Sequence, residues 1–302
     1  MNDIERVLEQ GGFHIKHWIV SGNMELGSGV NIIQCDQEKV KKIRSEPNLD
    51  YEECKTNFPS RLTRRMVLSQ ICSIYDPLGL VLPVTLKAKI MMREMICKDE
   101  VRDGKGNKES IGWDDPLPQE TVEQWKTFFC DLFNVELLKF QRCMKPNDAV
   151  GKPIIFSDGS TVAYGTCAYV RWELKGDGYA VRLIAAKNRL APIRQITIPR
   201  IELCRAVLAV RLRKTIVKEI YWNFYSVFHV DSAIVQSQIR KETCGFKTFV
   251  ATRLSEIQNK SSSNEWWWIK TKHNPADMTT RPCSVFSLGT ESMWQRGPEF
   301  MY

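Results

Sequence analysis

The fold is decided by residues 151–190, which read GKPIIFSDGSTVAYGTCAYVRWELKGDGYAVRLIAAKNRL. Three runs in this stretch have the apolar and β-branched content of strands, and short turns that contain glycine separate them. We therefore predict an antiparallel meander of three strands. Asp158 ends the first strand in an otherwise apolar run, so its carboxylate can project toward a site at the edge of the sheet.

The segment after the meander alternates helices and strands. A long helix is predicted from Ile201 to about Ile220, because Pro199 introduces it and Leu, Ala and Val fill it. The following segments read as a strand (225–231), a helix (232–242), a helix (246–260) and a strand (265–271). The order is that of the RNase H-like fold, an α/β fold with a mixed five-stranded sheet and flanking helices.

The amino-terminal half has a different organisation. We predict a helix from Asp3 to Gln10 followed by a strand, and poorly organised connecting chain over residues 21–60. Helical spacing of apolar residues then predicts a helix around residues 64–75, another from about Pro83 to Lys98, and an amphipathic helix within residues 117–140.

Composition limits the class of protein. The chain has 302 residues, of which 43% are hydrophobic and 26% charged, so it is globular and long enough for two domains. Its net charge of +8 favours polyanionic partners. The ten cysteines include no Cys-x-x-Cys pair and are expected to be reduced thiols. With no signal peptide and no membrane-spanning run, we expect an intracellular protein, cytoplasmic or nuclear, without a membrane partner.

Four acidic residues follow the predicted elements: Asp158 after strand one, Glu202 in the first turn of the long helix, Asp231 after strand four and Asp277 after strand five. Singly, each has a structural explanation as a helix cap, a dipole partner or a turn residue. Together they can converge at one edge of the sheet, where carboxylates repel unless cations neutralise them. The grouping predicts two Mg²⁺ or Mn²⁺ ions, about 3.5 to 4 Å apart.

A series of short strings carries a resemblance to a known family. They are GGFHIKHW (11–18), SQICSIYDPLGLVLPVTLKAKI (69–90), GWDDPLP (112–118), FSDGS (156–160), TIPRIELCRAVLAVRL (197–212), HVDSAIV (229–235), HNPADMTTR (273–281) and MWQRGPEF (293–300). In this order they resemble the end of the polymerase polyprotein of BEL/Pao-type LTR retrotransposons, from the remains of the reverse transcriptase into its RNase H-like domain. The resemblance covers most of the chain.

The resemblance implies three regions. Residues 1–59 would be a truncated reverse transcriptase palm or connection remnant, residues 60–145 a helical thumb- or connection-like region, and residues 146–302 an RNase H-like domain with a carboxy-terminal tail. The implied function is cleavage of the RNA strand of RNA–DNA hybrids by two-metal hydrolysis.

The resemblance also implies roles for the four acids. Asp158 would bridge both ions, Asp277 would complete the site of the ion that activates water, and Glu202 and Asp231 would hold the leaving-group ion. His273 stands four residues before Asp277 and is a candidate for the mobile histidine of such enzymes. We expect Asp158→Asn to relieve repulsion and leave the metal-free protein at least as stable as the parent.

The chain departs from the family pattern in two ways. No Tyr-x-Asp-Asp string is present, so we expect no DNA synthesis. Arg205 and Arg211 stand in a helix that usually presents small apolar residues there, which puts its packing in question. Hybrid binding is expected from basic residues near the site and from Trp266 to Trp268, two of which would be core or interface residues because a strand alternates its faces. The basic residues are Arg240, Lys241, Lys247, Lys270 and Lys272.

The sequence suggests two other functions. A catalytically inactive, transposon-derived remnant that binds nucleic acid or protein stays open as the alternative. The label of a Pao retrotransposon peptidase family is sometimes attached to this region, but an aspartic protease needs Asp-Thr/Ser-Gly. The chain offers only Asp-Gly-Ser at Asp158 and Asp-Ser-Ala at Asp231, so we reject peptidase chemistry.

Overall fold

The structure is a computed structural model, and it describes only part of the chain. The chain divides into two compact units, residues 1–49 and 50–302, and every described residue belongs to the second. The helix and strand predicted before residue 21 lie outside the described residues, as does the predicted connecting chain except at residues 58 and 59. The described residues are 58–59, 61–97, 111–141, 145–146, 149–176, 178–194, 196–220 and 226–302.

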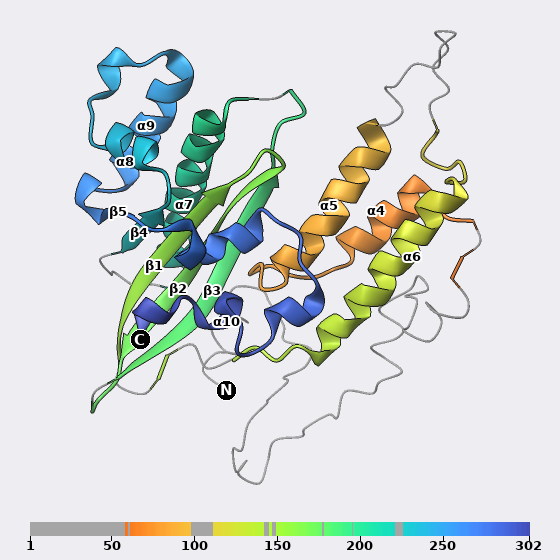
Figure 1. Ribbon diagram of the computed structural model, residues 1–302, viewed down its shortest axis with the longest axis horizontal. Coiled ribbons are helices and arrows are strands. Elements are labelled where there is room, and N and C mark those ends of the chain that lie inside the picture. Colours follow the sequence, from red (N-terminus) through yellow and green to blue (C-terminus); the bar gives the residue numbers. More distant parts are fainter. Residues whose placement is uncertain are drawn as a thin grey trace, which may run out of the picture. The chain divides into compact units, whose positions relative to one another are not determined.

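A five-stranded sheet in the order β3-β2-β1-β4-β5 forms the centre of this unit (Figure 1). The first three strands form the predicted antiparallel meander, and β4 and β5 run parallel to β1. The predicted RNase H-like fold, a mixed sheet with flanking helices, is confirmed. The strands are β1 Val150–Gly159, β2 Ala163–Glu173, β3 Tyr179–Leu190, β4 Val227–Val230 and β5 Trp266–Trp268.

Helices α7, α8 and α9 contribute the core on one face of the sheet. Strand side chains alternate between faces, so Ile155 points to this side while its neighbours Ile154 and Phe156 belong to the opposite core. Leu203 of α7 and Leu254 of α9 are fully buried against it. The helices span α7 Ile198–Ile220, α8 Ala233–Ile239 and α9 Thr248–Lys260.

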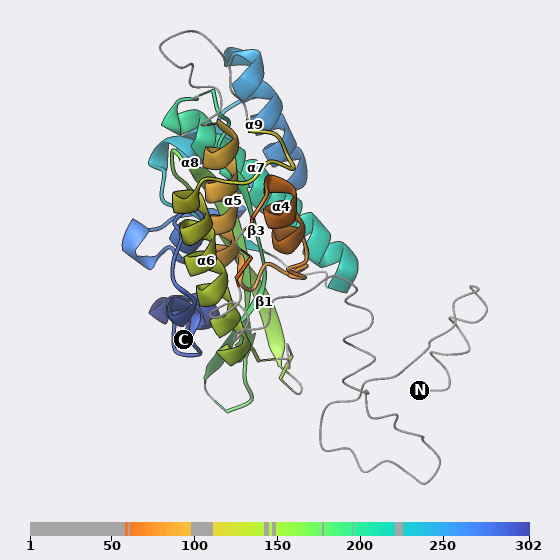
Figure 2. The same ribbon diagram turned by 90° about the vertical axis from the view of Figure 1, so that its right-hand side faces the viewer.

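The opposite face is covered by the earlier helical region and the carboxy-terminal segment (Figure 2). Val84 and Trp294 share one buried core with Phe156 and Tyr169 of the sheet. The Trp294 indole Nε1 donates to the Leu80 carbonyl oxygen at 2.7 Å, which ties the end of the chain to the start of α5. The helices are α4 Arg64–Cys72, α5 Leu82–Cys97, α6 Gln119–Phe133 and α10 Met293–Arg296. The 3₁₀ turns are η2 Asn134–Leu137, η3 Thr243–Gly245, η4 Ser263–Glu265, η5 Thr271–His273, η6 Pro275–Thr279, η7 Val285–Leu288 and η8 Glu299–Met301.

The turn before α5 docks closely on β3. Gly79 has a φ of 76°, and a Cβ at this position would lie 2.2 Å from the Ala186 carbonyl oxygen. Next to it, the Ala186 amide donates to the Leu78 carbonyl oxygen at 2.7 Å. Glycine is therefore required here both by the backbone conformation and by the close approach of two chain segments.

Several predicted boundaries were wrong, among them those of α7 and β5. Helix α7 begins at Ile198 rather than Ile201, because proline fits within the first turn of a helix and Pro199 does not interrupt it. Strand β5 has three residues rather than seven. After Trp268 the Ile269 amide still donates to the Val230 carbonyl oxygen, and the η5 turn begins two residues later, at Thr271.

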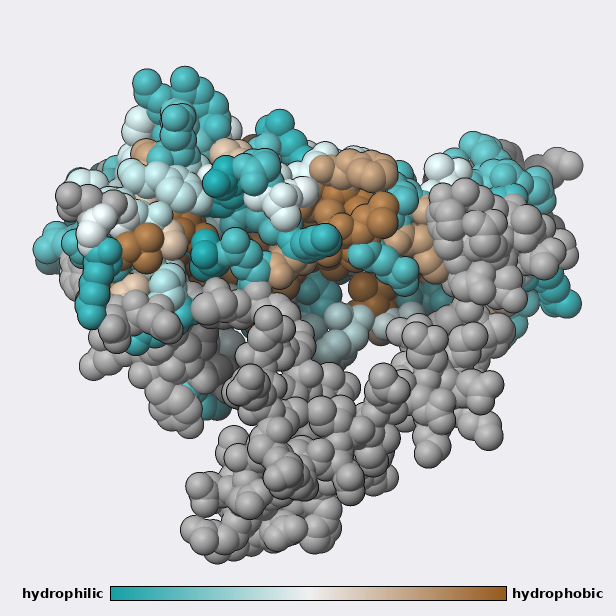
Figure 3. Space-filling view, turned by 90° about the horizontal axis from the view of Figure 1, so that it is seen from below, coloured by the Kyte–Doolittle hydropathy of each residue, from teal (hydrophilic) through white to brown (hydrophobic). Residues whose placement is uncertain are grey.

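Of the three consecutive tryptophans, two were expected to be core or interface residues, and the structure places one of them in the core. Only Trp266 is buried, while Trp267 and Trp268 are exposed at the edge of the sheet. In Figure 3 hydrophilic residues alternate with hydrophobic ones over the coloured surface, and the largest hydrophobic group lies to the right of the middle. Among the described residues, no helix is both long and apolar enough to cross a membrane.

Candidate functional site

Two acids lie at the carboxyl ends of neighbouring parallel strands. Asp158 is near the end of β1, and Asp231 follows β4 directly. The pairing of Ser157 with Val230 sets these ends side by side. The Asp158 residue is buried, and the Asp231 side chain is 14% exposed. The sheet thus brings two carboxylates to one edge, as predicted.

Glu202 reaches the same place from α7. Since α7 begins at Ile198, Glu202 lies in its second turn and not in the first turn as predicted. Its Oε2 accepts a hydrogen bond from the Ser232 hydroxyl at 2.6 Å. Ser232 also caps α8 by accepting from the Val235 amide, so it fills the N-cap role that Asp231 could have taken.

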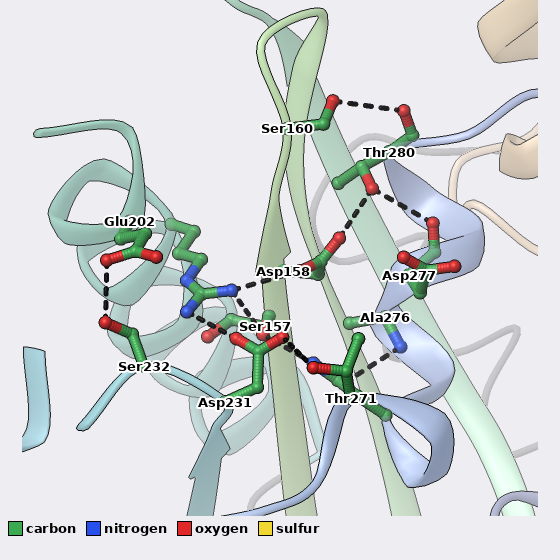
Figure 4. A network of polar contacts seen from close by, with 12 residues as sticks. Ser157, Asp158, Ser160, Glu202, Asp231, Ser232, Thr271, Ala276, Asp277 and Thr280 are labelled. Atoms are coloured by element: carbon green, nitrogen blue, oxygen red, sulfur yellow. Dashed lines mark hydrogen bonds and ion pairs between the residues drawn. The ribbon is translucent and has the colours of Figure 1, made fainter. Parts of the chain in front are cut away.

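Asp277 completes the group from the η6 turn. Burial raises the pKa of its carboxyl group, and the negative charges of Asp158 and Asp231 raise this pKa further. The Arg281 guanidinium opposes the increase from 3.2 Å away. The four predicted acids therefore gather around one end of the sheet, and Figure 4 shows Glu202, Asp158, Asp231 and Asp277 arranged there.

A buried arginine lies between two of these acids. The Arg205 Nη1 is 3.1 Å from Asp158 Oδ1, and its Nη2 is 2.6 Å from Asp231 Oδ1. The Arg205 side chain is 1% exposed. The two acids that it contacts, Asp158 and Asp231, are labelled in Figure 4, where dashed lines mark their ion pairs. A positive charge thus bridges the ends of β1 and β4.

Each of the four carboxylates has a protein partner. Besides the contacts of Arg205, Thr280 donates to Asp158 Oδ2 at 2.6 Å, and Thr271 donates to Asp231 Oδ2 at 3.2 Å. Glu202 is held by Ser232 and Asp277 by Arg281. Within the described part of the chain, no three or more His, Cys, Asp or Glu side chains are placed to hold a metal ion. The residues as arranged do not fit two divalent ions, because a guanidinium lies between the two strand-end acids.

The histidines near the site do not supply an obvious proton carrier. His229 of β4 stacks on Phe156 with 5.0 Å between ring centroids and packs edge-on to Phe300. Burial, together with the nearby positive charge of Lys152, lowers the pKa of His229 to about 4, so the ring is neutral at pH 7. His273 is exposed at the end of η5, and its role as a mobile histidine stays a prediction.

An exposed aromatic and basic rim borders the acids. Trp267 is 56% exposed and Trp268 is 48% exposed. The Trp268 Nε1 donates to the Asp231 carbonyl oxygen at 3.0 Å, so this ring stands directly beside the site. The predicted basic residues of this region are all exposed: Arg240, Lys241, Lys247, Lys270 and Lys272.

The contact between Arg205 and the acids was missed by the sequence reasoning. Arg205 and Arg211, two of the four arginines of α7, were expected to put its packing in question, yet α7 runs without a break past both. The spacing of the two residues could have indicated this contact. Arg205 follows Glu202 by three residues, and positions three apart share a helix face.

Comparisons with known proteins agree with this architecture. The family model described as "Pao retrotransposon-like RNaseH-like domain" matches residues 63–232, more than half of the chain. The matched range contains Asp158, Glu202, Asp231 and Arg205. A comparison with curated proteins found no match.

Three solved structures align with the chain over limited parts. The amino-terminal RNase H domain of a Mycobacterium tuberculosis protein, fused to maltose binding protein, is 16% identical over 41% of this chain and 86% of that chain, with a TM-score of 0.29. RNase H1 of Halobacterium salinarum is 11% identical over 40% and 86%, with a TM-score of 0.26. A foamy viral protease-reverse transcriptase in complex with dsDNA is 10% identical over 68% and 41%, with a TM-score of 0.33. At these TM-scores the fold assignment rests on the strand order and the family match.

Proposed function

The chain belongs to the Pao retrotransposon-like RNase H-like family, and on this premise we propose that it binds RNA–DNA hybrid beside its acidic site without cutting it. The observation that carries the proposal is the Arg205 guanidinium between Asp158 and Asp231. Two-metal hydrolysis needs those carboxylates as ion ligands, and here they are paired with a fixed positive charge. This favours the alternative of an inactive nucleic-acid-binding remnant.

Binding is supported by the rim around the acids. Trp268 stands beside Asp231, and both Trp268 and its neighbour Trp267 are exposed. Exposed lysines follow them at Lys270 and Lys272. Bases stack on aromatic rings, and lysines gain affinity by releasing counterions from phosphates. The acids do not repel the duplex with their full charge, because Arg205 and Arg281 offset part of it.

Metal-dependent cleavage of the RNA strand is the second candidate function. It is favoured by the presence of all four acids at one end of the sheet, where burial raises the pKa of Asp277 and the negative charges of Asp158 and Asp231 raise it further. For cleavage, Arg205 would have to leave the space between the strand ends. Cleavage that requires Mg²⁺ or Mn²⁺ and stops in chelator distinguishes this function from binding alone.

DNA synthesis is not part of the proposed function. The sequence contains no Tyr-x-Asp-Asp string, which supplies the catalytic carboxylates in polymerases of this kind. Incorporation of labelled nucleotide into a primed template by the pure protein would overturn this part of the proposal.

Hybrid binding is tested by fluorescence anisotropy with a labelled RNA–DNA duplex. We expect Trp267→Ala to weaken binding about 5- to 150-fold, since stacking on one base contributes about 1–3 kcal/mol. The matched control is Trp113→Ala, because Trp113 is 44% exposed and lies before α6, away from the acids in sequence and fold. Affinity should also fall as salt is added. Equal affinity of the Trp267 variant and the parent would contradict the placement of the duplex.

A further inference from the structure

Arg205 is placed by α7 as part of the acidic site. It follows Glu202 by three residues, so both side chains leave the helix on the same side. Its Cδ would lie 3.4 Å from a Cβ built on Gly159, which shows how closely the arginine stem passes the end of β1. A small residue at position 205 would leave this space between α7 and the strand ends unfilled.

The guanidinium is held by charge more than by hydrogen bonds. Nη1 donates to Asp158 Oδ1 and, at 3.4 Å, to the Ser157 carbonyl oxygen. Nη2 lies 2.6 Å from Asp231 Oδ1 without hydrogen-bond alignment, and Nε has no hydrogen-bond partner among the described residues. Buried donors without acceptors are unfavourable. The two ion pairs must therefore supply most of the stabilisation of the buried guanidinium.

The acids in turn need a positive charge at this point. Asp158 and Asp231 project from adjacent strand ends, and their shared counter-charge is the one guanidinium that contacts both in the described residues. Without it, two largely buried carboxylates would face each other with hydroxyl donors alone. Carboxylates in such a position recruit hard divalent cations, which bind oxygen ligands.

We propose that the Arg205 guanidinium is the built-in cation of this site and that it stands in for a divalent metal ion between Asp158 and Asp231. It follows that a neutral side chain at position 205 turns the acidic cluster into a site for Mg²⁺ or Mn²⁺. This inference deepens the proposed function, because it names what holds the acids together in a domain that binds without cutting.

The test compares the thermal stability of variants at position 205 with and without divalent cations. We expect Arg205→Ala to melt below the parent in chelator and to gain about 5 to 10 °C in Tm at a roughly hundredfold excess of Mg²⁺ or Mn²⁺ over its Kd. The parent and Arg205→Lys should show no such gain, because a fixed positive charge is retained. Titration calorimetry with Mn²⁺ should detect binding to Arg205→Ala but not to the parent or to Arg205→Lys.

Two controls separate a specific site from a general effect. Arg211→Ala removes another arginine of α7, one that pairs with Glu256 instead of the acidic cluster, and this variant should not acquire a response to Mg²⁺. Adding Asp231→Asn to Arg205→Ala should abolish the increase in Tm that Mg²⁺ or Mn²⁺ produces. Arg205→Gln, which is neutral and longer than alanine, should behave like Arg205→Ala if loss of charge and not loss of volume creates the site.

Each outcome decides for or against the inference. If Arg205→Ala and Arg205→Gln are unfolded in chelator, Mg²⁺ or Mn²⁺ must restore their circular dichroism, and failure to do so overturns the inference. Binding of Mn²⁺ by the parent at the same affinity as by Arg205→Ala also overturns it. The melts and the calorimetry use no nucleic acid. Metal binding by the Arg205 variants is therefore tested independently of hybrid binding by the parent, and either result can be negative while the other is positive.

Discussion

At the scale of single residues, Asp158 has two close protein partners, Arg205 and Thr280. The substitution Asp158→Asn removes the charge that pairs with a buried guanidinium. We expect it to destabilise the metal-free protein by about 3 kcal/mol, because breaking a buried ion pair from one side leaves the other charge uncompensated. Urea unfolding in chelator at neutral pH measures the change.

This expectation reverses the one drawn from sequence, where relief of repulsion was expected to leave Asp158→Asn at least as stable as the parent. The reason is Arg205, whose guanidinium makes Asp158 attracted rather than repelled. Asp277→Asn is the matched control within the cluster. The pKa of Asp277 is raised by burial and by its acidic neighbours, so its neutralisation should not destabilise the fold. Unchanged stability of the Asp158 variant would count against the ion pair.

The positions of the four acids were predictable because strand ends and helix starts can be recognised from local patterns. Asp158 and Asp231 follow apolar strands, and Glu202 follows Pro199 near the start of a helix. The partners of these acids were not predictable in the same way. Whether Arg205 points to solvent or into the site depends on the rotation of α7 relative to the sheet, which is a matter of tertiary packing.

At the scale of elements, Glu256 of α9 ties that helix to α7. The Arg211 Nε donates to Glu256 Oε1 at 2.7 Å, and the Arg211 Nη2 donates to Glu256 Oε2 at 2.7 Å. Lys260 pairs with the same carboxylate. The hydrogen bond from Arg211, aided by Lys260, lowers the pKa of Glu256 to about 2. A lowered pKa in the folded state stabilises the protein above the unfolded pKa, and this stabilisation is lost as pH falls.

We therefore expect Glu256→Gln to melt below the parent at neutral pH. The difference should shrink as pH falls from about 4.5 toward 2, because the parent carboxylate then becomes protonated as well. Thermal melts across this range measure it. In an Arg211→Ala, Lys260→Ala background the effect of Glu256→Gln should be absent. A difference that is independent of pH would show that the charge of Glu256 is not what stabilises the packing.

Most elements were predicted correctly, because runs of apolar residues with a period of two or of 3.6 are local features. The meander over residues 151–190 and helices α5 and α6 are examples. The errors fall where contacts between elements decide the outcome. Strand β5 is short because the chain turns away after Ile269, and Trp267 is exposed on this edge strand of the sheet.

At the scale of the whole molecule, the helical region before residue 97 and the sheet share one core. Val84 of α5 is buried with Phe156 of β1. Lys89 donates to the Asn188 side chain at 2.9 Å, and Arg93 donates to the Ala191 carbonyl oxygen at 3.0 Å. The division into regions at residue 145, which the resemblance implied, stays a prediction. These contacts indicate that the two parts stabilise each other.

The substitution Gly79→Ala tests this docking. We expect it to destabilise the protein by more than about 1–3 kcal/mol, because it adds backbone strain at a φ of 76° and a clash with the Ala186 carbonyl oxygen. Gly176→Ala is the matched control. Gly176 also has a positive φ, of 96°, but a Cβ there meets nothing within 4 Å. Urea unfolding of both variants separates the effect of the clash from that of the backbone strain. An equal decrease in the free energy of unfolding in both variants would mean that the turn does not dock closely on β3.

The most direct measurement is incubation of the intact chain with a hybrid labelled on its RNA strand, in Mg²⁺ and in chelator, followed by gel analysis of the bound fraction. We predict that the parent retains the hybrid and that the RNA is recovered at full length under both conditions, since Arg205 occupies the place between Asp158 and Asp231. Shortening of the RNA by the parent in Mg²⁺, abolished by chelator and by Asp158→Asn, would contradict this account.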